Sequence, residues 1–333
     1  MKTKLLYLVR RLAEFVVSLV ALALVIFSLI FIAPGDPARV LVGTKNATPE
    51  LLAQIREKYG LDDPFFVQFG RWVWGALHGN FGTSIQSGQP VTEYVAPHAQ
   101  VTFELVLFSL VLSIIFGLLF GVVSAKGRGK PRDGVISAVA LVGTSAPSFA
   151  IGLVFLYIFA LRLGLFPIYG VGNGTWTDTL WHLALPAICL TFAVTALIIK
   201  VTRASLLVEV EKDYSTFLRA RAVAPFAITA AQIRNASAPI FTSTGLVLAN
   251  LFGGTILVES VFSIPGLGNL LANAVTFHDV PVIQFIALML ASMICLASAV
   301  VDIAVAFINP LSRGHRNRFP SKAAARTGEG MAL

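Results

Sequence analysis

The chain has 333 residues, of which 56% are hydrophobic and only 13% are charged, and its mean hydropathy is +0.80. Because soluble chains carry about 25% charged residues, this composition predicts an integral membrane protein. The 27 glycines and 16 prolines are spread along long apolar runs, which excludes a disordered chain, a collagen-like repeat and a coiled coil.

The first apolar run extends from Phe15 to Ala33 and contains no charged residue. It is long enough to cross a bilayer as a helix. Fourteen of its residues are Leu, Ile, Val or Phe, and at about −0.3 to −0.6 kcal/mol for each residue the insertion is favoured by roughly 4 to 8 kcal/mol. We therefore predict that residues 1–33 form an N-terminal tail and the first transmembrane helix.

A large loop, residues 34–99, follows on the outer side and has helical signals of its own. Thr48 can cap a helix that starts at Pro49 and stops before Gly60. Residues 65–77 are dense in Phe and Trp, which indicates a second helix along the outer membrane interface. The loop either caps the helix bundle by packing or helps to receive an external partner.

Five more apolar runs follow, at residues 102–124, 135–160, 181–201, 239–259 and 282–308. The sequence thus predicts an all-α membrane protein with six transmembrane helices, five of them in residues 100–333. With a cytoplasmic N-terminus, 19 of the 25 Lys and Arg residues fall on the cytoplasmic side, which predicts that both termini are cytoplasmic. Topology and contact with anionic membrane lipid then explain the net charge of +8, so we expect no nucleic-acid binding.

The inner loop, residues 203–238, is the longest one on the cytoplasmic side. Ala224 precedes Pro225, and a residue before proline avoids helical torsions. The pattern therefore predicts a short helix, a break and a second short helix. This element is either a surface helix whose cations reach past its apolar residues or a knob that docks into a soluble partner.

At this inner loop the chain resembles the permease subunits of bacterial ATP-binding-cassette importers of the dipeptide, oligopeptide and nickel family. The resemblance runs almost end to end, through residues 33–37, 59–62, 81–84, 102–105, 146–149, 166–167, 185–187, 202–205 and 213–239. Its densest block is formed by residues 253–254 and 259–268, followed by residues 279–281 and Asp302. It implies a type I importer permease fold in the bacterial inner membrane. It also implies partners: a second homologous permease in a heterodimer, two cytoplasmic ATPases and an extracytoplasmic peptide-binding protein.

The resemblance further implies residues that couple the permease to the ATPases. They are Asp213, Tyr214, Phe217, Leu218, Arg219, Arg221, Ala222, Arg234 and Asn235. The chain departs from the family pattern in three places: Ala222 stands where glycine is usual, residues 216–218 stand where a more acidic or small-residue lead is usual, and His278 stands where arginine is usual. Because alanine disfavours the left-handed torsions that glycine permits, we expect a continued helix rather than a sharp corner at Ala222.

Motifs for enzyme chemistry are missing from the sequence. The segment Ser124–Pro131 comes closest to a phosphate-binding loop but lacks its first glycine and its final hydroxyl. The five histidines are not at metal-ligand spacing, and Cys189 and Cys295 lie in apolar runs. We therefore expect no catalysis and no cofactor in this chain, with ATP and Mg bound by the partner subunits.

Charged and irregular positions within the membrane suggest a translocation path or gate. Such positions usually face a bundle interior or a wet cavity, and the candidates are Glu104, Glu259, Phe262, Pro265, Gly266 and Asp302. The alternative for the three acids is pairing between helices. Gly117 and Gly121 indicate close helix packing, either within the chain or against a second permease.

The predicted function is import of dipeptides or oligopeptides by alternating access. One alternative is the same machine importing nickel chelates or another small solute. A second, different alternative is a secondary transporter that works alone; it would need internal repeats with broken midplane helices, and we find no clear internal symmetry.

Overall fold

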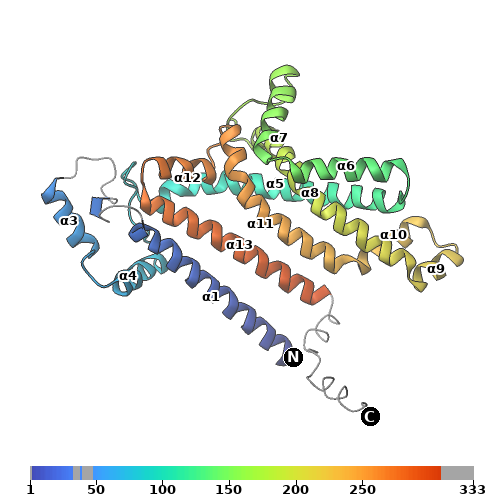
Figure 1. Ribbon diagram of the computed structural model, residues 1–333, viewed down its shortest axis with the longest axis horizontal. Coiled ribbons are helices and arrows are strands. Elements are labelled where there is room, and N and C mark those ends of the chain that lie inside the picture. The colour runs from blue at the N-terminus through green and yellow to red at the C-terminus, as the bar shows by residue number, and fades with distance from the viewer. Residues whose placement is uncertain (1, 33–37, 40–47, 309–333) are drawn as a thin grey trace, which may run out of the picture.

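The computed structural model describes residues 2–32, 38–39 and 48–308 (Figure 1). Within these ranges the chain is helical apart from loops and one isolated bridge between Thr83 and Pro90. The helices are α1 (Lys2–Ile32), α3 (Pro49–Tyr59), α4 (Phe65–Leu77), α5 (Val91–Lys126), α6 (Pro131–Ser145), α7 (Ser148–Phe155), the π-helix η1 (Leu156–Arg162), α8 (Trp176–Glu211), α9 (Asp213–Ala220), α10 (Pro225–Asn235), α11 (Ser237–Val261), α12 (Leu267–Thr276) and α13 (Val280–Ile308). The expected C-terminal tail and the segment 33–37 lie outside the described residues.

Five helices are long and apolar enough to cross a membrane by themselves: α1, α5, α8, α11 and α13. The expectation of one continuous helix over residues 135–160 is wrong. Here α6 and the pair α7–η1 meet at an angle of 109°. The cause is local, since Ala146 takes extended torsions (φ −85°, ψ 135°) directly before Pro147. Six spans result when the bent pair is counted as one.

The long helices run side by side along the long axis of the molecule (Figure 1). Helix α5 packs most extensively on α8, α11 lies between α8 and α13, and α1 packs on α13. The short helices α9 and α10 lie at one end of this bundle, and α3, α4 and α12 lie at the other (Figure 1). The molecule therefore has short helices at both ends and long apolar helices between them.

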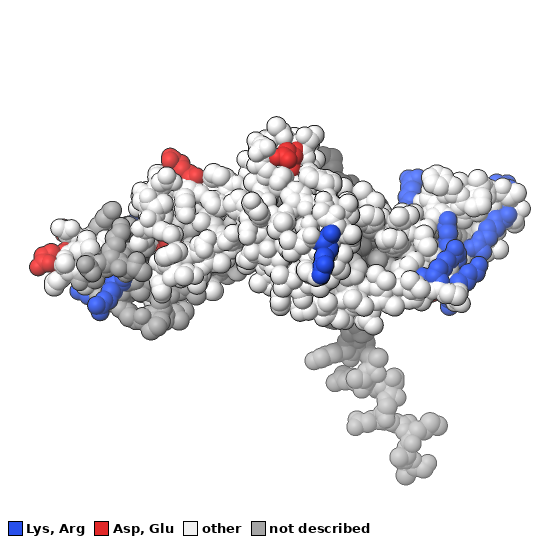
Figure 2. All heavy atoms as spheres, turned by 90° about the horizontal axis from the view of Figure 1, so that it is seen from above, with Lys and Arg blue, Asp and Glu red and all other residues white. Residues whose placement is uncertain are grey.

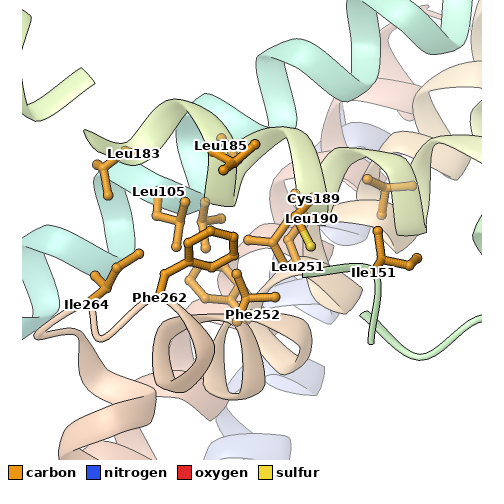
Figure 3. Packing of buried hydrophobic residues seen from close by; sticks show 14 of the residues in the cluster. Leu105, Ile151, Leu183, Leu185, Cys189, Leu190, Leu251, Phe252, Phe262 and Ile264 are labelled. Carbon is orange, nitrogen blue, oxygen red and sulfur yellow. The ribbon is translucent and has the colours of Figure 1, made fainter. Parts of the chain in front are cut away.

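The main core fills the contact between α5, α8 and α11. Leu105, Leu185 and Leu251, one from each helix, are at most 1% exposed and meet in one cluster (Figure 3). Two glycines let α5 approach α8 closely. A Cβ on Gly117 would lie 2.5 Å from Ile198 Cγ2, and one on Gly121 would lie 2.6 Å from Thr202 Cβ. Of the two alternatives for these glycines, packing within the chain is therefore the one observed.

The outer helices form as the sequence predicts. Thr48 Oγ1 accepts a hydrogen bond from the Leu51 N–H at 3.3 Å, and Gly60 ends α3 in a left-handed conformation (φ 57°). Aromatic residues of α4 pack on α1: the Phe27 ring lies 5.5 Å from that of Phe65 and 5.7 Å from that of Trp72. These contacts favour a packing role for this part of the outer loop.

Candidate functional site

The inner loop folds as helix, turn and helix. We call residues 213–235, comprising α9, the turn and α10, the coupling hairpin. Pro225 occupies the first turn of α10, where a missing N–H costs nothing. The helix–break–helix prediction is confirmed.

The expectation of a continued helix at Ala222 is wrong. Ala222 has a φ of 52°, in the left-handed region. The Ala222 N–H donates to the Arg219 carbonyl at 3.0 Å, and the Val223 N–H donates to the Leu218 carbonyl at 3.2 Å. This pair of bonds is the usual glycine-type helix ending, so its hydrogen bonds outweigh the steric cost that alanine pays in this conformation.

A buried carboxylate fastens the coupling hairpin to the end of α8. Glu209 is 5% exposed. Its carboxylate accepts hydrogen bonds from Lys212 Nζ at 2.5 Å and from the Tyr214 hydroxyl at 2.7 Å. The bond to Glu209 raises the pKa of Lys212, while burial, followed by the same carboxylate, raises the pKa of Tyr214. Lys212 thus stays charged and Tyr214 stays protonated, which keeps both bonds in place.

A second buried bond joins the two helices of the coupling hairpin. Gln232 Nε2, on α10, donates to Ser215 Oγ, on α9, at 2.7 Å. Ser215 is fully buried and Gln232 is 5% exposed. Because a buried polar group that loses its partner costs about 1–3 kcal/mol, this bond resists separation of α9 from α10.

The outward face of the coupling hairpin carries aromatic rings and cations. Phe217 is 57% exposed and Phe226 is 84% exposed, and the Arg221 guanidinium lies 4.7 Å from the centre of the Phe217 ring. Arg219 and Arg234 are also exposed, whereas Leu218 is half-buried. Figure 2 shows Lys and Arg crowded at this end of the molecule and an almost uncharged middle. Such a face suits docking to a soluble protein.

The structure thus gathers the sequence-predicted coupling residues on one element, with Asp213 at the start of α9 and Asn235 at the end of α10. Sequence reasoning missed Glu209, Gln232 and Phe226. Phe226 could have been found, because it stands four and eight residues before Ala230 and Arg234 on the exposed side of α10. The roles of Glu209 and Gln232 depend on contacts across the turn, which periodicity does not reveal.

An ion pair ties α6 to α8, ten residues before the coupling hairpin begins. Arg203 Nε and Nη2 donate to the two carboxylate oxygens of Asp133, both at 2.8 Å, and Ser124 Oγ, on α5, donates to the same carboxylate at 2.5 Å. The Asp133 side chain is 10% exposed. Paired, directional bonds of this kind are the strong ones, so α5, α6 and α8 are held together at the ends that carry these three residues.

Glu259, one of the predicted gate residues, is a structural joint in this conformation. It is fully buried and accepts hydrogen bonds from Thr102 Oγ1 at 2.6 Å and from the N–H groups of Gly268 at 2.7 Å and Asn269 at 3.2 Å. The carboxylate therefore caps the N-terminus of α12, where negative charge is favoured. Of the two alternatives for this acid, pairing between elements is observed.

The turn after α11 packs tightly around that carboxylate. A Cβ on Gly266 would lie 2.3 Å from Glu259 Cδ, so the turn accommodates only glycine there. Phe262 is 2% exposed and belongs to the main core (Figure 3), whereas Pro265 is exposed. The predicted irregular turn is present, and in this conformation it is closed by packing.

The other two acids do not join this group. Glu104 is half-buried and accepts a hydrogen bond from Gln100 of its own helix at 2.9 Å. The side chain of Asp302 lies outside the described residues, although its backbone belongs to α13. Sequence reasoning did not identify a further contact, in which Ser84 Oγ donates to buried Asp279 Oδ2 at 2.5 Å and ties the outer loop to the start of α13.

In the part of the chain that the structure describes, no three His, Cys, Asp or Glu residues are grouped as metal ligands. The buried acids are committed to structural hydrogen bonds, as the preceding contacts show. Three sets of contacts along the length of the bundle hold helices together, so that a movement of one helix is passed to its neighbours. They are the coupling hairpin, the Arg203–Asp133 pair and the hydrogen bonds of Glu259.

Comparisons with known proteins give the following relationships. Residues 117–314 match the family described as "Binding-protein-dependent transport system inner membrane component", and residues 4–114 match its N-terminal counterpart, "Binding-prot-dependent transport system membrane comp, N-term". A probable peptide ABC transporter permease protein, y4tP, of Sinorhizobium fredii is 34% identical over 310 residues, 92% of this chain and 99% of the relative. The glutathione transport system permease protein GsiC of Escherichia coli is 34% identical over 308 residues, 92% of this chain and 98% of the relative.

A solved structure shares the fold. A chain of the MetNI methionine ABC transporter, in an inward-facing conformation, aligns with a TM-score of 0.54 at 16% identity. The alignment covers 65% of this chain and 96% of that one. The predicted type I importer fold is confirmed.

Proposed function

This chain belongs to the family of binding-protein-dependent transport system inner membrane components, and on that premise we propose that it conducts peptides across the membrane as one of two permease subunits. Family members are multi-pass inner-membrane proteins rather than enzymes, and separate subunits hydrolyse ATP. Relatives named for peptide and glutathione transport, 34% identical to this chain over 92% of its length, support a peptide substrate.

The coupling hairpin is the surface that docks into the ATPases. The observation that carries this assignment is the pairing of exposed aromatic rings and arginines with a buried anchor to α8. Phe217 and Phe226 supply apolar area to bury, while Arg219 and Arg234 orient the contact. Glu209 then passes movement of the hairpin into α8.

The cycle follows from this arrangement. The two ATPases bind ATP and Mg and close, the coupling hairpin moves with them, and α8 tilts so that the cavity between the permeases opens toward an external peptide-binding protein. The basic end of the molecule lies in the cytoplasm with both termini, in keeping with the distribution of Lys and Arg (Figure 2). The second permease is a homologous but different chain.

Charge reversal at Arg219 tests the docking surface. In the complex assembled with its ATPases and binding protein, Arg219→Glu should cost about 2 kcal/mol of docking energy, about 30-fold in affinity, and should abolish peptide-stimulated ATP hydrolysis. Arg219→Lys keeps the charge and should retain part of the activity. Arg128→Glu makes the same reversal at the same end but breaks only an exposed pair with Glu211, so it should leave the activity close to normal.

Three results would contradict the proposal. Normal peptide-stimulated hydrolysis by Arg219→Glu would remove the hairpin from the docking surface. Stimulation by nickel chelates or another small solute, and by no peptide in a panel of different lengths, would replace the substrate class. Transport by this chain alone in vesicles would establish a secondary transporter instead.

A further inference from the structure

A cavity lies at the break between α6 and α7. Its volume is ≈ 280 Å³, and α6, α7, α8 and α11 contribute its walls. Three uncharged polar residues line it, Thr144, Ser148 and Asn250; the other lining residues are aliphatic or glycine, and none of them is charged. The volume is near the lower limit of about 300 Å³ for small-molecule sites.

Asn250 presents an amide on the exposed side of α11. Its Nδ2 donates to the Leu246 carbonyl at 2.9 Å, and its Oδ1 accepts no hydrogen bond from the described residues. An amide exposed to hydrocarbon without its hydrogen bonds costs several kcal/mol. An exposed Asn250 therefore avoids this free-energy cost only if water or a polar ligand reaches its amide.

The exposed stripe of α11 differs from that of α5. On α5 the exposed positions at helical spacing are all apolar, as expected for contact with lipid: Phe103, Leu107, Val111, Ile115 and Leu119. On α11 they include amide, hydroxyl and glycine: Thr242, Leu246, Asn250, Gly253, Leu257 and Ser260. Because both helices cross the same membrane, the difference indicates that the α11 stripe faces a wet path.

Gly253 is the next exposed residue of this stripe after Asn250, and its neighbour Gly254 lines the cavity. A Cβ at this position would meet nothing within 4 Å, whereas a Cβ on Gly254 would lie 3.3 Å from Leu190. Gly253 therefore lies on the side of α11 away from the core, three residues from Asn250, where a side chain would contact none of the described residues.

We propose that this cavity is a station on the translocation path, where the Asn250 carboxamide pairs with the backbone of a peptide in transit. A carboxamide carries one acceptor oxygen and two donor hydrogens, which match the C=O and N–H of a peptide bond. The aliphatic walls accept varied side chains, and the lack of charge in the lining avoids selection by substrate charge. The inference rests on the proposed function, since it assumes that peptides are the transported solute.

Cysteine labelling tests whether the site is wet. In membranes containing the whole complex, Asn250→Cys and Gly253→Cys should react with a charged, membrane-impermeant maleimide at least about tenfold faster than Ile115→Cys, because only a hydrated thiol ionises to the reactive thiolate. The wild-type protein, whose Cys189 is buried and whose Cys295 is half-buried, gives the background. Equal rates for the three variants would place the α11 stripe in lipid and overturn the proposal.

Peptide uptake tests the role of the amide. Asn250→Leu should lower uptake of a labelled peptide about tenfold, the loss expected for one or two hydrogen bonds, in complexes shown to be assembled by copurification. Asn250→Gln keeps the carboxamide and should retain most of the uptake. Normal uptake by Asn250→Leu would refute the pairing. No peptide uptake by the wild-type complex would instead refute the proposed function, whatever the labelling shows.

Discussion

Whether the substitution Ala222→Gly stabilises or destabilises the coupling hairpin depends on the left-handed turn at Ala222. Left-handed torsions cost an L-residue about 1–2 kcal/mol, and glycine avoids that cost. Glycine also has about 0.4–1 kcal/mol more freedom to lose from the unfolded chain. The net expectation is that Ala222→Gly stabilises the turn by about 1 kcal/mol, about fivefold in the equilibrium between its closed and open forms.

Hydrogen exchange at this turn is the suitable measurement. The amides of Ala222 and Val223 close it by donating to the carbonyls of Arg219 and Leu218. In the purified complex, Ala222→Gly should slow their exchange about fivefold, in line with the stabilisation above. Ala230→Gly provides the control, because Ala230 is an exposed residue inside α10, where glycine should destabilise the helix by about 1 kcal/mol and speed exchange.

The opposite result is equally clear. If the chain continued as a right-handed helix through Ala222, glycine would destabilise it as it does in α10, and exchange would become faster. Faster exchange in Ala222→Gly would therefore refute the left-handed turn and restore the sequence-based expectation.

Two further predictions concern the contacts that hold the bundle. Gly117→Val should destabilise the fold by about 1–3 kcal/mol through overpacking against Ile198, which would lower the melting temperature of the purified complex. The control Gly134→Ala, with no atom within 4 Å of its Cβ, should leave the melting temperature unchanged or slightly higher. Equal melting temperatures for the two variants would mean that α5 does not approach α8 as described. Asp133→Asn and Arg203→Leu should each lower the melting temperature, because each single change leaves a partly buried charge without its partner. The double variant should lower the melting temperature by less than the sum of the two single effects. Additive effects would show that the two side chains are not coupled.

Patterns in the sequence predicted the elements whose causes are local. The caps at Thr48 and Gly60 and the proline at the start of α10 depend on neighbouring residues, and the structure confirms them. The apolar runs located the spans because hydrocarbon demands about 20 apolar residues in a row. Their ends were less well predicted: α8 continues to Glu211, since helix propensity carries a helix past the edge of its apolar segment.

Features that depend on distant contacts were not predictable in the same way. The break at Ala146 lies in a motif that sequence analysis noted without expecting a bend. Local preference was misleading at Ala222, because hydrogen bonds at the end of α9 override the torsional preference of alanine. In the candidate sites, the exposed arginines were identified through the family resemblance, while the roles of Glu209 and Thr102 emerged only from the partners that packing brings to them.

The length of α8 determines how far its far end moves when the helix tilts by a small angle. Its 36 residues correspond to about 54 Å at 1.5 Å for each residue. If Glu209 anchors one end of this rod to a rotating body, a tilt of only about 5° sweeps the far end through about 5 Å, close to the pitch of one helical turn. Modest rocking at the Glu209 end of α8 can thus displace the far end of the helix by as much as the spacing between neighbouring side chains, without any helix having to unwind.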